Sequence, residues 1–266
     1  MCRLLGWVAR QPVSLADALG RAELERFVAL SRRHADGWGL ARRSQPGADG
    51  PPLVQRSTTC AAKDPAFARL TTTAAADAGF VHLRWATPGH AVLPANTHPF
   101  VHKDMAFAHN GAIHPFDRLD EILPDGWSAQ MTGSTDSERY FLAVAQRLQA
   151  GDSMGDAVGG VVRRIFRDFN PTSLNAMLLT NEALYVVSAH DPTRAPSLCE
   201  TSGGDDPSTA TDLAFYDLRY RAGADAVIVA SSGFDQPDGA WQPLDNMTLL
   251  RVERATLTTS TVPLAA

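Results

Sequence analysis

The sequence predicts an α+β fold in which two β-sheets pack face to face with helices on the outside. Apolar, strand-like runs fall in two groups, at roughly residues 1–113 and 175–260, and the two strongest helical patterns lie between these groups. The 266 residues contain no internal repeat and no stretch with the composition of a linker. We therefore expect a single domain that spans residues 1–266.

The first part of the chain predicts a buried strand, two helical segments and a tight turn. Residues 2–8 form a short apolar run, which is typical of a buried strand and would fix the amino terminus inside the fold. A helical pattern runs over residues 14–30 with a break at Gly20, and residues 65–70 predict a short helix. Residues 34–39 form a turn punctuated by glycines that leads into a strand.

The middle of the chain predicts strands that carry polar residues unusual for a core. Residues 79–87 indicate a buried strand that contains Arg84, and residues 104–113 indicate a second strand-like region that contains Asn110-Gly111. An Asn-Gly pair between two apolar runs is the strongest short-range signal for a β-hairpin. The simplest interpretation of Asn110-Gly111 is therefore a type I′ turn.

Two helices and a second group of strands are predicted for the rest of the chain. Thr135 and Glu138 have the spacing of a capping box at the start of a helix. A further helix is expected over about residues 153–169. Apolar runs at residues 176–180, 184–188 and 226–230 predict strands, and residues 247–259 predict a closing strand pair.

The composition describes a globular protein without the marks of a nucleic-acid-binding, membrane or secreted protein. Hydrophobic residues make up 44% of the chain, and the net charge of −5 comes with no basic stripe. No segment approaches the roughly 20 apolar residues that span a bilayer, and the amino terminus does not have a signal-peptide pattern. Cys2, Cys60 and Cys199 give neither a disulfide framework nor a zinc pattern. We expect a soluble, cytoplasmic protein with no nucleic-acid and no membrane partner.

The sequence offers no evident site for a metal or a cofactor. His98 and His102 have a His-x3-His spacing, but Pro99 argues against a helix there and no third ligand is evident. No glycine-rich loop that could hold phosphates is present. His82 is expected to lie against the core as a neutral imidazole. We therefore expect no metal and no cofactor.

Four local features are difficult to explain by folding alone. Arg84 is a charge within an apolar run, Asn110-Gly111 ends a strand, Asp136 begins a helix, and Cys2 stands at the second position. Each has a structural alternative: Arg84 could pair with a core carboxylate, the Asn-Gly pair could only turn, and Asp136 could only cap its helix.

Cys2 has a chemical property that the other two cysteines do not share. Methionine is normally removed before a small residue, which would leave Cys2 with a thiol and a free α-amino group. Such an amine titrates near ~7.7–8.0 and a thiol near ~8.5, so the neutral amine can take the thiol proton directly or through one water. Taken alone, a cysteine at this position is more often accidental than catalytic.

Together the four features describe a pocket for an amino acid. A cation suited to bidentate contacts can hold an α-carboxylate, and an anion can hold an α-ammonium group. A thiol and a pair of amide donors can then meet a carbonyl at the far end of the substrate.

Six motifs that include these features occur in order along the chain. They are Met1-Cys2-Arg3, His34-Ala35-Asp36-Gly37-Trp38-Gly39, Arg84-Trp85-Ala86-Thr87-Pro88-Gly89, Thr97-His98-Pro99-Phe100, His109-Asn110-Gly111 and Ser134-Thr135-Asp136-Ser137-Glu138. Together they resemble the class II glutamine amidotransferase domain, an N-terminal-nucleophile hydrolase. The resemblance covers the first half of the chain closely, whereas the second half matches only as generic strands and helices.

The resemblance implies a four-layer α/β/β/α sandwich and a catalytic set. Cys2 is implied as the nucleophile and its α-amine as the base. Asn110 and Gly111 are implied to form the oxyanion hole, from the side-chain amide and a backbone N–H.

The resemblance also implies a set of substrate-binding residues. Arg84 would bind the substrate α-carboxylate and Asp136 its α-amino group, while residues 34–39 shape the pocket wall. The remaining members of this set are Trp85, Thr87 and His109. One departure is Pro88, where several amidotransferases carry a histidine. Because that histidine is not the base, we expect activity to survive its absence.

The implied reaction is hydrolysis of the γ-glutamyl amide bond of glutamine or of a γ-glutamyl compound through a γ-glutamyl thioester. The chain is expected to end with the amidase, so it either feeds ammonia to a separate synthase subunit or acts alone on a small γ-glutamyl molecule. The chain resembles the small stand-alone branch of the family, which includes proteins of uncertain substrate and the γ-glutamyl hydrolase of ergothioneine synthesis. Residues 97–100 are more similar to the former proteins, so the ergothioneine hydrolase is the second choice. A non-catalytic, glutamine-sensing subunit is a further alternative, which retention of Cys2, Asn110 and Gly111 argues against. A homo-oligomer is left open.

Overall fold

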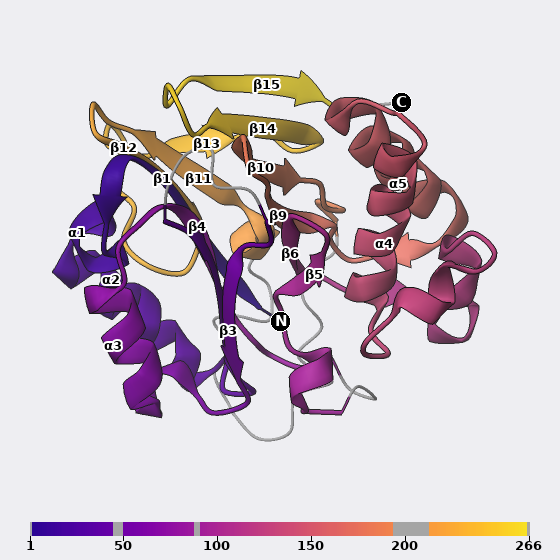
Figure 1. Ribbon diagram of the computed structural model, residues 1–266, viewed down its shortest axis with the longest axis horizontal. Helices are drawn as coiled ribbons and strands as arrows, with labels where there is room; N and C mark the ends of the chain where they lie inside the picture. Colours follow the sequence, from indigo (N-terminus) through magenta and orange to yellow (C-terminus); the bar gives the residue numbers. More distant parts are fainter. Residues whose placement is uncertain (1, 45–49, 88–90, 194–212, 265–266) are drawn as a thin grey trace.

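Two antiparallel β-sheets lie face to face in the centre of the structure, with helices over both outer faces (Figure 1). The computed structural model describes residues 2–44, 50–87, 91–193 and 213–264. The first sheet has seven strands, in the order β13 (Gln242–Leu244), β11 (Leu218–Ala222), β12 (Ala226–Ser231), β1 (Arg3–Val13), β4 (Ala76–Leu83), β2 (Trp38–Arg43) and β3 (Leu53–Ser57). The second has six, in the order β15 (Thr259–Pro263), β14 (Thr248–Glu253), β10 (Ala183–Ser188), β9 (Asn175–Leu179), β6 (Met105–Asn110) and β5 (Phe100–His102). A separate pair joins β7 (Ile113–His114) to β8 (Asn170–Pro171).

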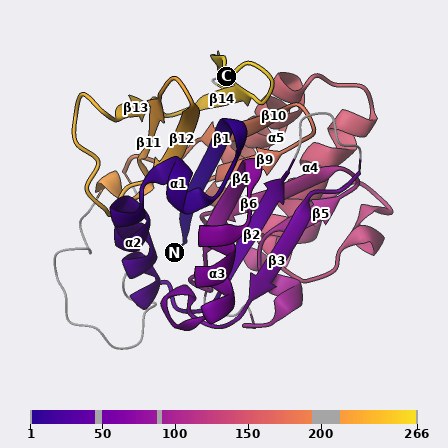
Figure 2. The ribbon, with the colours of Figure 1, turned by 60° about the vertical axis from the view of Figure 1, so that its left-hand side comes forward.

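In the described part of the chain, five α-helices cover the outer faces of the sheets. They are α1 (Leu15–Leu19), α2 (Arg21–Ala29) and α3 (Pro65–Thr73) on the seven-stranded sheet, and α4 (Asp136–Gln149) and α5 (Met154–Asp168) on the six-stranded sheet. Figure 2 shows α1, α2 and α3 in front of the first sheet, with α4 and α5 behind. The break expected in the first helical segment lies at Gly20, whose φ of 103° favours glycine. The side chain of Ser14 caps α1 by accepting a hydrogen bond from the Asp17 N–H.

The apolar run of β1 is buried on both faces of its sheet. Leu5, Trp7 and Ala9 pack against the core under α1, α2 and α3. Leu4 and Val8 point the other way and pack against the second sheet. Side chains alternate between the faces of a strand, so a central strand covered on both faces needs a continuous apolar run. This packing fixes the amino-terminal strand between its neighbours, as the sequence predicts.

Three apolar cores separate four layers of secondary structure. The first core lies between α1–α3 and the seven-stranded sheet, the second between the two sheets, and the third between the six-stranded sheet and α4 and α5. Phe67, Phe80 and Phe141 are fully buried representatives of the three, in that order. The expected α+β sandwich with the layer order α/β/β/α is confirmed.

The two groups of strands in the sequence do not correspond to the two sheets. The first sheet combines β1 to β4 with β11, β12 and β13, and the second combines β5 and β6 with β9, β10, β14 and β15. For example, β1 pairs with β12, with Leu5 opposite Ala230. The chain therefore crosses between the sheets, and both contain strands from its two halves.

The hairpin interpretation of Asn110-Gly111 is wrong. β6 pairs with β5 and β9, whereas β7, which follows the Asn-Gly pair, pairs with β8. A type I′ turn requires a positive φ at both central residues, and Gly111 does not have one. A Cβ on Gly111 would lie 1.9 Å from the backbone oxygen of Ser173, so glycine is needed here for close packing rather than for a turn.

The strand expected over residues 79–87 is shorter than predicted. β4 ends at Leu83, and beyond it the backbone pairs with a turn: the Arg84 N–H donates to Gly37 O at 2.8 Å and the Asp36 N–H to Arg84 O at 3.1 Å. Arg84 therefore stands at the end of the strand instead of inside the sheet. No helix in the described part of the chain is long and apolar enough to cross a membrane.

Candidate active site

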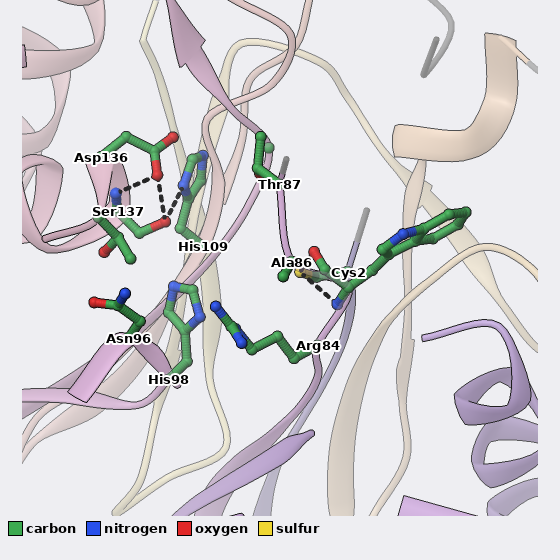
Figure 3. Close-up of a pocket in the computed structure, with 12 residues that line it drawn as sticks. Cys2, Arg84, Ala86, Thr87, Asn96, His98, His109, Asp136 and Ser137 are labelled. Carbon is green, nitrogen blue, oxygen red and sulfur yellow. Dashed lines mark hydrogen bonds between the residues drawn. The ribbon is translucent and has the colours of Figure 1, made fainter. Parts of the chain in front are cut away.

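A pocket lies where Cys2, the ends of β4 and β6 and the start of α4 come together (Figure 3). Its lining comes from segments that are far apart in the sequence. They are Cys2, Arg84, Trp85, Ala86, Thr87, Asn96, His98, His109, Gly111, Thr135, Asp136 and Ser137. The sequence-predicted site residues thus line one pocket, except Asn110, which contacts the backbone of Cys2.

Cys2 is held at the pocket by the backbone of the segment that follows β4. The Trp85 N–H donates to Cys2 Sγ, and the thiol can in turn donate to Trp85 O, both over 3.4 Å. Cys2 is only 8% exposed. This burial raises the pKa of the Cys2 thiol, although the Trp85 N–H bond and the Arg84 charge act in the opposite direction. At neutral pH the thiol is therefore protonated unless a base removes the proton.

Asn110 ends β6 with its side chain completely buried beside Cys2. The backbone N–H of Cys2 donates to Asn110 Oδ1 over 3.0 Å. Asn110 Nδ2 is buried and has no hydrogen-bond partner among the residues that the structure describes. A buried amide donor without a partner is uncommon in folded proteins, and a catalytic role is one explanation for such a group. The next residue, Gly111, lines the pocket.

Arg84 brings a positive charge into the pocket from the end of β4. Its side chain is buried, and Nη2 donates to Ala91 O at 3.3 Å. Nη1 has no partner among the described residues, and no ion pair with a carboxylate is formed there either. Burial lowers the pKa of Arg84, partly offset by Cys2 and Asp36. Among the described residues, Arg84 therefore does not form the ion pair with a core carboxylate that the structural alternative required.

Asp136 is the first residue of α4, but the cap of this helix is Thr135. The Thr135 hydroxyl accepts from the Glu138 N–H at 3.1 Å. Asp136 Oδ2 accepts from the Ile113 N–H at 2.9 Å, and Oδ1 accepts from the Ser137 N–H at 2.8 Å. The carboxylate therefore connects the segment after β6 to the start of α4. Only half of the expected capping box forms, because the Glu138 carboxylate binds the N–H groups of residues 132 and 133.

His109 lines the pocket with both ring nitrogens already engaged. Nδ1 lies 2.9 Å from Ser137 Oγ, and Nε2 lies 2.9 Å from Ser173 O. Burial lowers the pKa of His109, with Asp136 acting against it. The ring is part of a network that holds the start of α4 against β6.

The turn at residues 34–39 supports the segment that carries Arg84 and Trp85. Asp36 Oδ2 accepts from the Ala86 N–H at 2.8 Å, and the His34 ring meets the Trp85 ring edge-on with centroids 5.4 Å apart. This motif lies beside the pocket without contributing to its lining.

Five lining residues were not predicted as catalytic or substrate-binding residues. They are Ala86, Asn96, His98, Thr135 and Ser137. His98 was considered only as a metal ligand, and in the described part of the chain no group of His, Cys, Asp and Glu could hold a metal ion. Cys60 is buried and donates to Ser31 O at 3.1 Å, away from the pocket, while Cys199 and Pro88 lie outside the described residues. The sequence feature that could have identified His98 as a pocket residue was its place in the motif at residues 97–100.

Comparison with known proteins gives a family match over almost the whole chain. Residues 1–258 match the family model for class II glutamine amidotransferases. A glutamine–fructose-6-phosphate aminotransferase of Zymomonas mobilis is 38% identical over 85 residues, which cover 32% of this chain and 14% of that protein. The corresponding protein of Mycobacterium leprae is 29% identical over 189 residues, covering 66% of this chain and 28% of that protein. The chain thus spans less than a third of the length of either relative.

Solved structures share the fold at low sequence identity. A glutamine aminotransferase class-II domain protein from Silicibacter pomeroyi superposes with a TM-score of 0.67 at 19% identity, covering 100% of both chains. Glutamine phosphoribosylpyrophosphate amidotransferase from B. subtilis has a TM-score of 0.60 at 12% identity, covering 99% of this chain and 49% of that one. A predicted glutamine amidotransferase from Pseudomonas aeruginosa has a TM-score of 0.54 at 17% identity, covering 96% and 99%.

Proposed function

Because the chain belongs to the class II glutamine amidotransferases, a family of enzymes that hydrolyse the amide of glutamine, we propose that it cleaves glutamine or a γ-glutamyl compound through a thioester on Cys2. The observation that carries the proposal is the position of the Cys2 thiol in a pocket that also contains Arg84 and Asp136. A thiol, a cation and an anion in one pocket match the γ-amide, α-carboxylate and α-ammonium groups of such a substrate.

The base in this proposal is the nitrogen of Cys2 itself. Removal of Met1 converts that nitrogen into an α-amine, which titrates near ~7.7–8.0. Because burial keeps the thiol protonated, the amine takes its proton, directly or through one water, as Sγ attacks the amide carbon. Asn110 Oδ1, 3.0 Å from this nitrogen, holds the amine next to the thiol.

The oxyanion that forms on the amide oxygen is stabilised by Asn110 Nδ2 and the backbone N–H of Gly111. Nδ2 is buried and has no other partner among the described residues, so it is available to the substrate. Fixed donors in a buried site stabilise a developing negative charge strongly, because they need no reorganisation when the charge appears.

A γ-glutamyl thioester on Cys2 then divides the reaction into two steps, its formation and its hydrolysis. The Cys2 ammonium gives its proton to the leaving nitrogen, the carbon–nitrogen bond breaks, and ammonia or an amine leaves a γ-glutamyl thioester. The neutral amine next takes a proton from water, which attacks the thioester and releases glutamate with the thiol restored. When the substrate is glutamine, the ammonia can serve a separate synthase subunit.

The α-carbon end of the substrate is held by Arg84 and Asp136. Arg84 Nη1 has no partner among the described residues, which leaves it available for the α-carboxylate. The Asp136 oxygens accept backbone N–H groups at 2.8 and 2.9 Å, and these contacts orient the carboxylate toward the α-ammonium group. Trp85 and Thr87 line the same pocket, and His109 positions Ser137.

The test combines the mass of the purified protein with a glutaminase assay. We expect the mass to lack Met1, and glutamate to be released from glutamine or from γ-glutamyl amides. Cys2→Ala should abolish this release and keep the fold, whereas the matched control Cys60→Ala, which removes a buried thiol outside the pocket, should retain it. Full activity in protein that retains Met1 would rule out the amine as the base.

A further inference from the structure

Two neighbouring groups of the pocket lack hydrogen-bond partners in the part of the chain that the structure describes. They are Nη1 of Arg84 and both ring nitrogens of His98. The Asn96 amide and the His109 ring, which also line the pocket, have their partners. His98 is only 5% exposed, and buried polar groups are normally paired. A ligand in the pocket would supply hydrogen-bond partners for these two side chains.

His98 is held in place by packing rather than by polar contacts of its ring. Its ring centroid lies 4.2 Å from that of His82 and 4.8 Å from that of Phe100. Its backbone oxygen lies so close to Gly39 that a Cβ there would approach it to 1.9 Å. Figure 3 shows the guanidinium group of Arg84 pointing toward the His98 ring. The imidazole is thus fixed beside the cation.

The environment keeps His98 neutral. Burial lowers its pKa well below the ordinary value, and the neighbouring His82, His109 and Arg84 act in the same direction. A neutral imidazole carries one N–H donor and one acceptor nitrogen. The imidazole donor and the Arg84 donor together suit an anion with two acceptor atoms, and the positive charge of Arg84 disfavours a metal ion.

We propose that His98 is a specificity-determining residue, whose imidazole donates a second hydrogen bond to the substrate α-carboxylate that Arg84 binds. The inference rests on the proposed function, because it takes the ligand to be a γ-glutamyl compound. The α-carboxylate does not change its charge during amide cleavage, so this hydrogen bond acts equally in the ground state and the transition state. Its loss should therefore raise KM and leave kcat nearly unchanged.

The experiment compares three compounds with the wild-type protein and His98→Phe. Glutamine carries both α-groups, glutaramate lacks the α-amino group, and 4-aminobutanamide lacks the α-carboxylate. We expect His98→Phe to weaken kcat/KM for glutamine and glutaramate about 10–100-fold, as for the loss of a hydrogen bond to a charged group. The value for 4-aminobutanamide, measured as a substrate or as a competitive inhibitor of glutamine hydrolysis, should stay the same.

Two further sets of variants separate recognition from folding. His98→Asn and His98→Gln keep an N–H near the positions of Nδ1 and Nε2, and restored binding of glutamine by either supports the donor role. His82→Gln is the matched control, since it removes a neighbouring buried imidazole that does not line the pocket. It should lower stability without changing the discrimination between glutamine and 4-aminobutanamide.

An equal loss for all three compounds in His98→Phe would show a structural role and overturn the inference alone. An unchanged KM for glutamine would overturn it as well. If the wild-type protein, freed of Met1, hydrolyses neither glutamine nor any γ-glutamyl amide, the proposed function fails and the inference fails with it.

Discussion

At the residue scale, the two ends of the Asn110 side-chain amide have different roles. Its oxygen accepts from the Cys2 nitrogen at 3.0 Å, while its nitrogen is buried without a partner among the described residues. In the proposed mechanism the oxygen orients the base and the nitrogen stabilises the oxyanion. An aspartate in its place would keep the first contact and lose the second.

Asn110→Ala should lower kcat for glutamine about 10²–10³-fold, the usual result of removing one oxyanion donor. Asn110→Asp should lower kcat by at least as much, since it retains an acceptor for the Cys2 nitrogen but offers no N–H to the oxyanion. Single-turnover kinetics, corrected for the folded fraction, gives the measurement. An unchanged kcat per folded molecule in Asn110→Asp would assign the residue to folding only.

At the element scale, the start of β2 packs through close backbone contacts against the segment before β5, which carries the pocket residue His98. A Cβ on Gly39 would lie 1.9 Å from His98 O and 2.6 Å from Pro99 Cδ. Two motifs that the sequence shows as separate stretches therefore touch in the structure. The glycine is required by the approach of another segment, because a side chain in this place would push His98 out of position.

We expect Gly39→Ala to lower the free energy of unfolding by at least about 1–3 kcal/mol, the usual cost of overpacking a core. Gly155→Ala is the matched control. Its Cβ would have no neighbour closer than 3.8 Å, and alanine in a helix is favoured over glycine by about 0.5–1 kcal/mol. Urea unfolding of both variants tests this, and equal stabilities would contradict the packing argument.

On the scale of the whole molecule, the two sheets meet around three buried histidines. His82 comes from β4 and His109 from β6, and His82 Nε2 lies 3.2 Å from His109 O. His98 lies against His82. Burial is the main cause, and the charge of Arg84 the second, that lowers the pKa of His82 to about 3. Burial is also the first cause of the lowered pKa values of His98 and His109. His82 is thereby the neutral core imidazole that the sequence suggested.

These histidines should make the fold sensitive to mild acid. In the unfolded chain each titrates near ~6.5, whereas in the folded protein each stays neutral to lower pH. Below about pH 6.5 the unfolded state therefore binds more protons, and stability falls as the pH falls, by up to about 1.4 kcal/mol per pH unit for each histidine. Urea unfolding from about pH 7 to about pH 4 measures the slope. His82→Gln should reduce it, and an unchanged slope in that variant would contradict the assignment.

The sequence determined the fold class, most helices and the central strands. Continuous apolar runs predicted β1, β9, β10 and β12, because strands buried on both faces leave this pattern. The edge strand β3 and the strand β11 were missed, since their side chains are largely half-buried or exposed and charged or polar residues interrupt their apolar positions. Periodicity could not assign strands to sheets either, because pairing between distant segments is absent from local sequence.

For the site, the sequence determined which residues are candidates for the chemistry, and the tertiary structure decided how they are arranged. Cys2, Arg84, Gly111 and Asp136 were identified from their motifs, and they line one pocket. Only the structure showed that Asn110 contacts the Cys2 nitrogen instead of turning a hairpin, and that Arg84 leaves the sheet. It also placed His98 in the pocket, where neither ring nitrogen has a hydrogen-bond partner among the described residues. Residue type limits the chemistry that a side chain can perform, whereas burial and unpaired polar groups arise only when distant segments pack together.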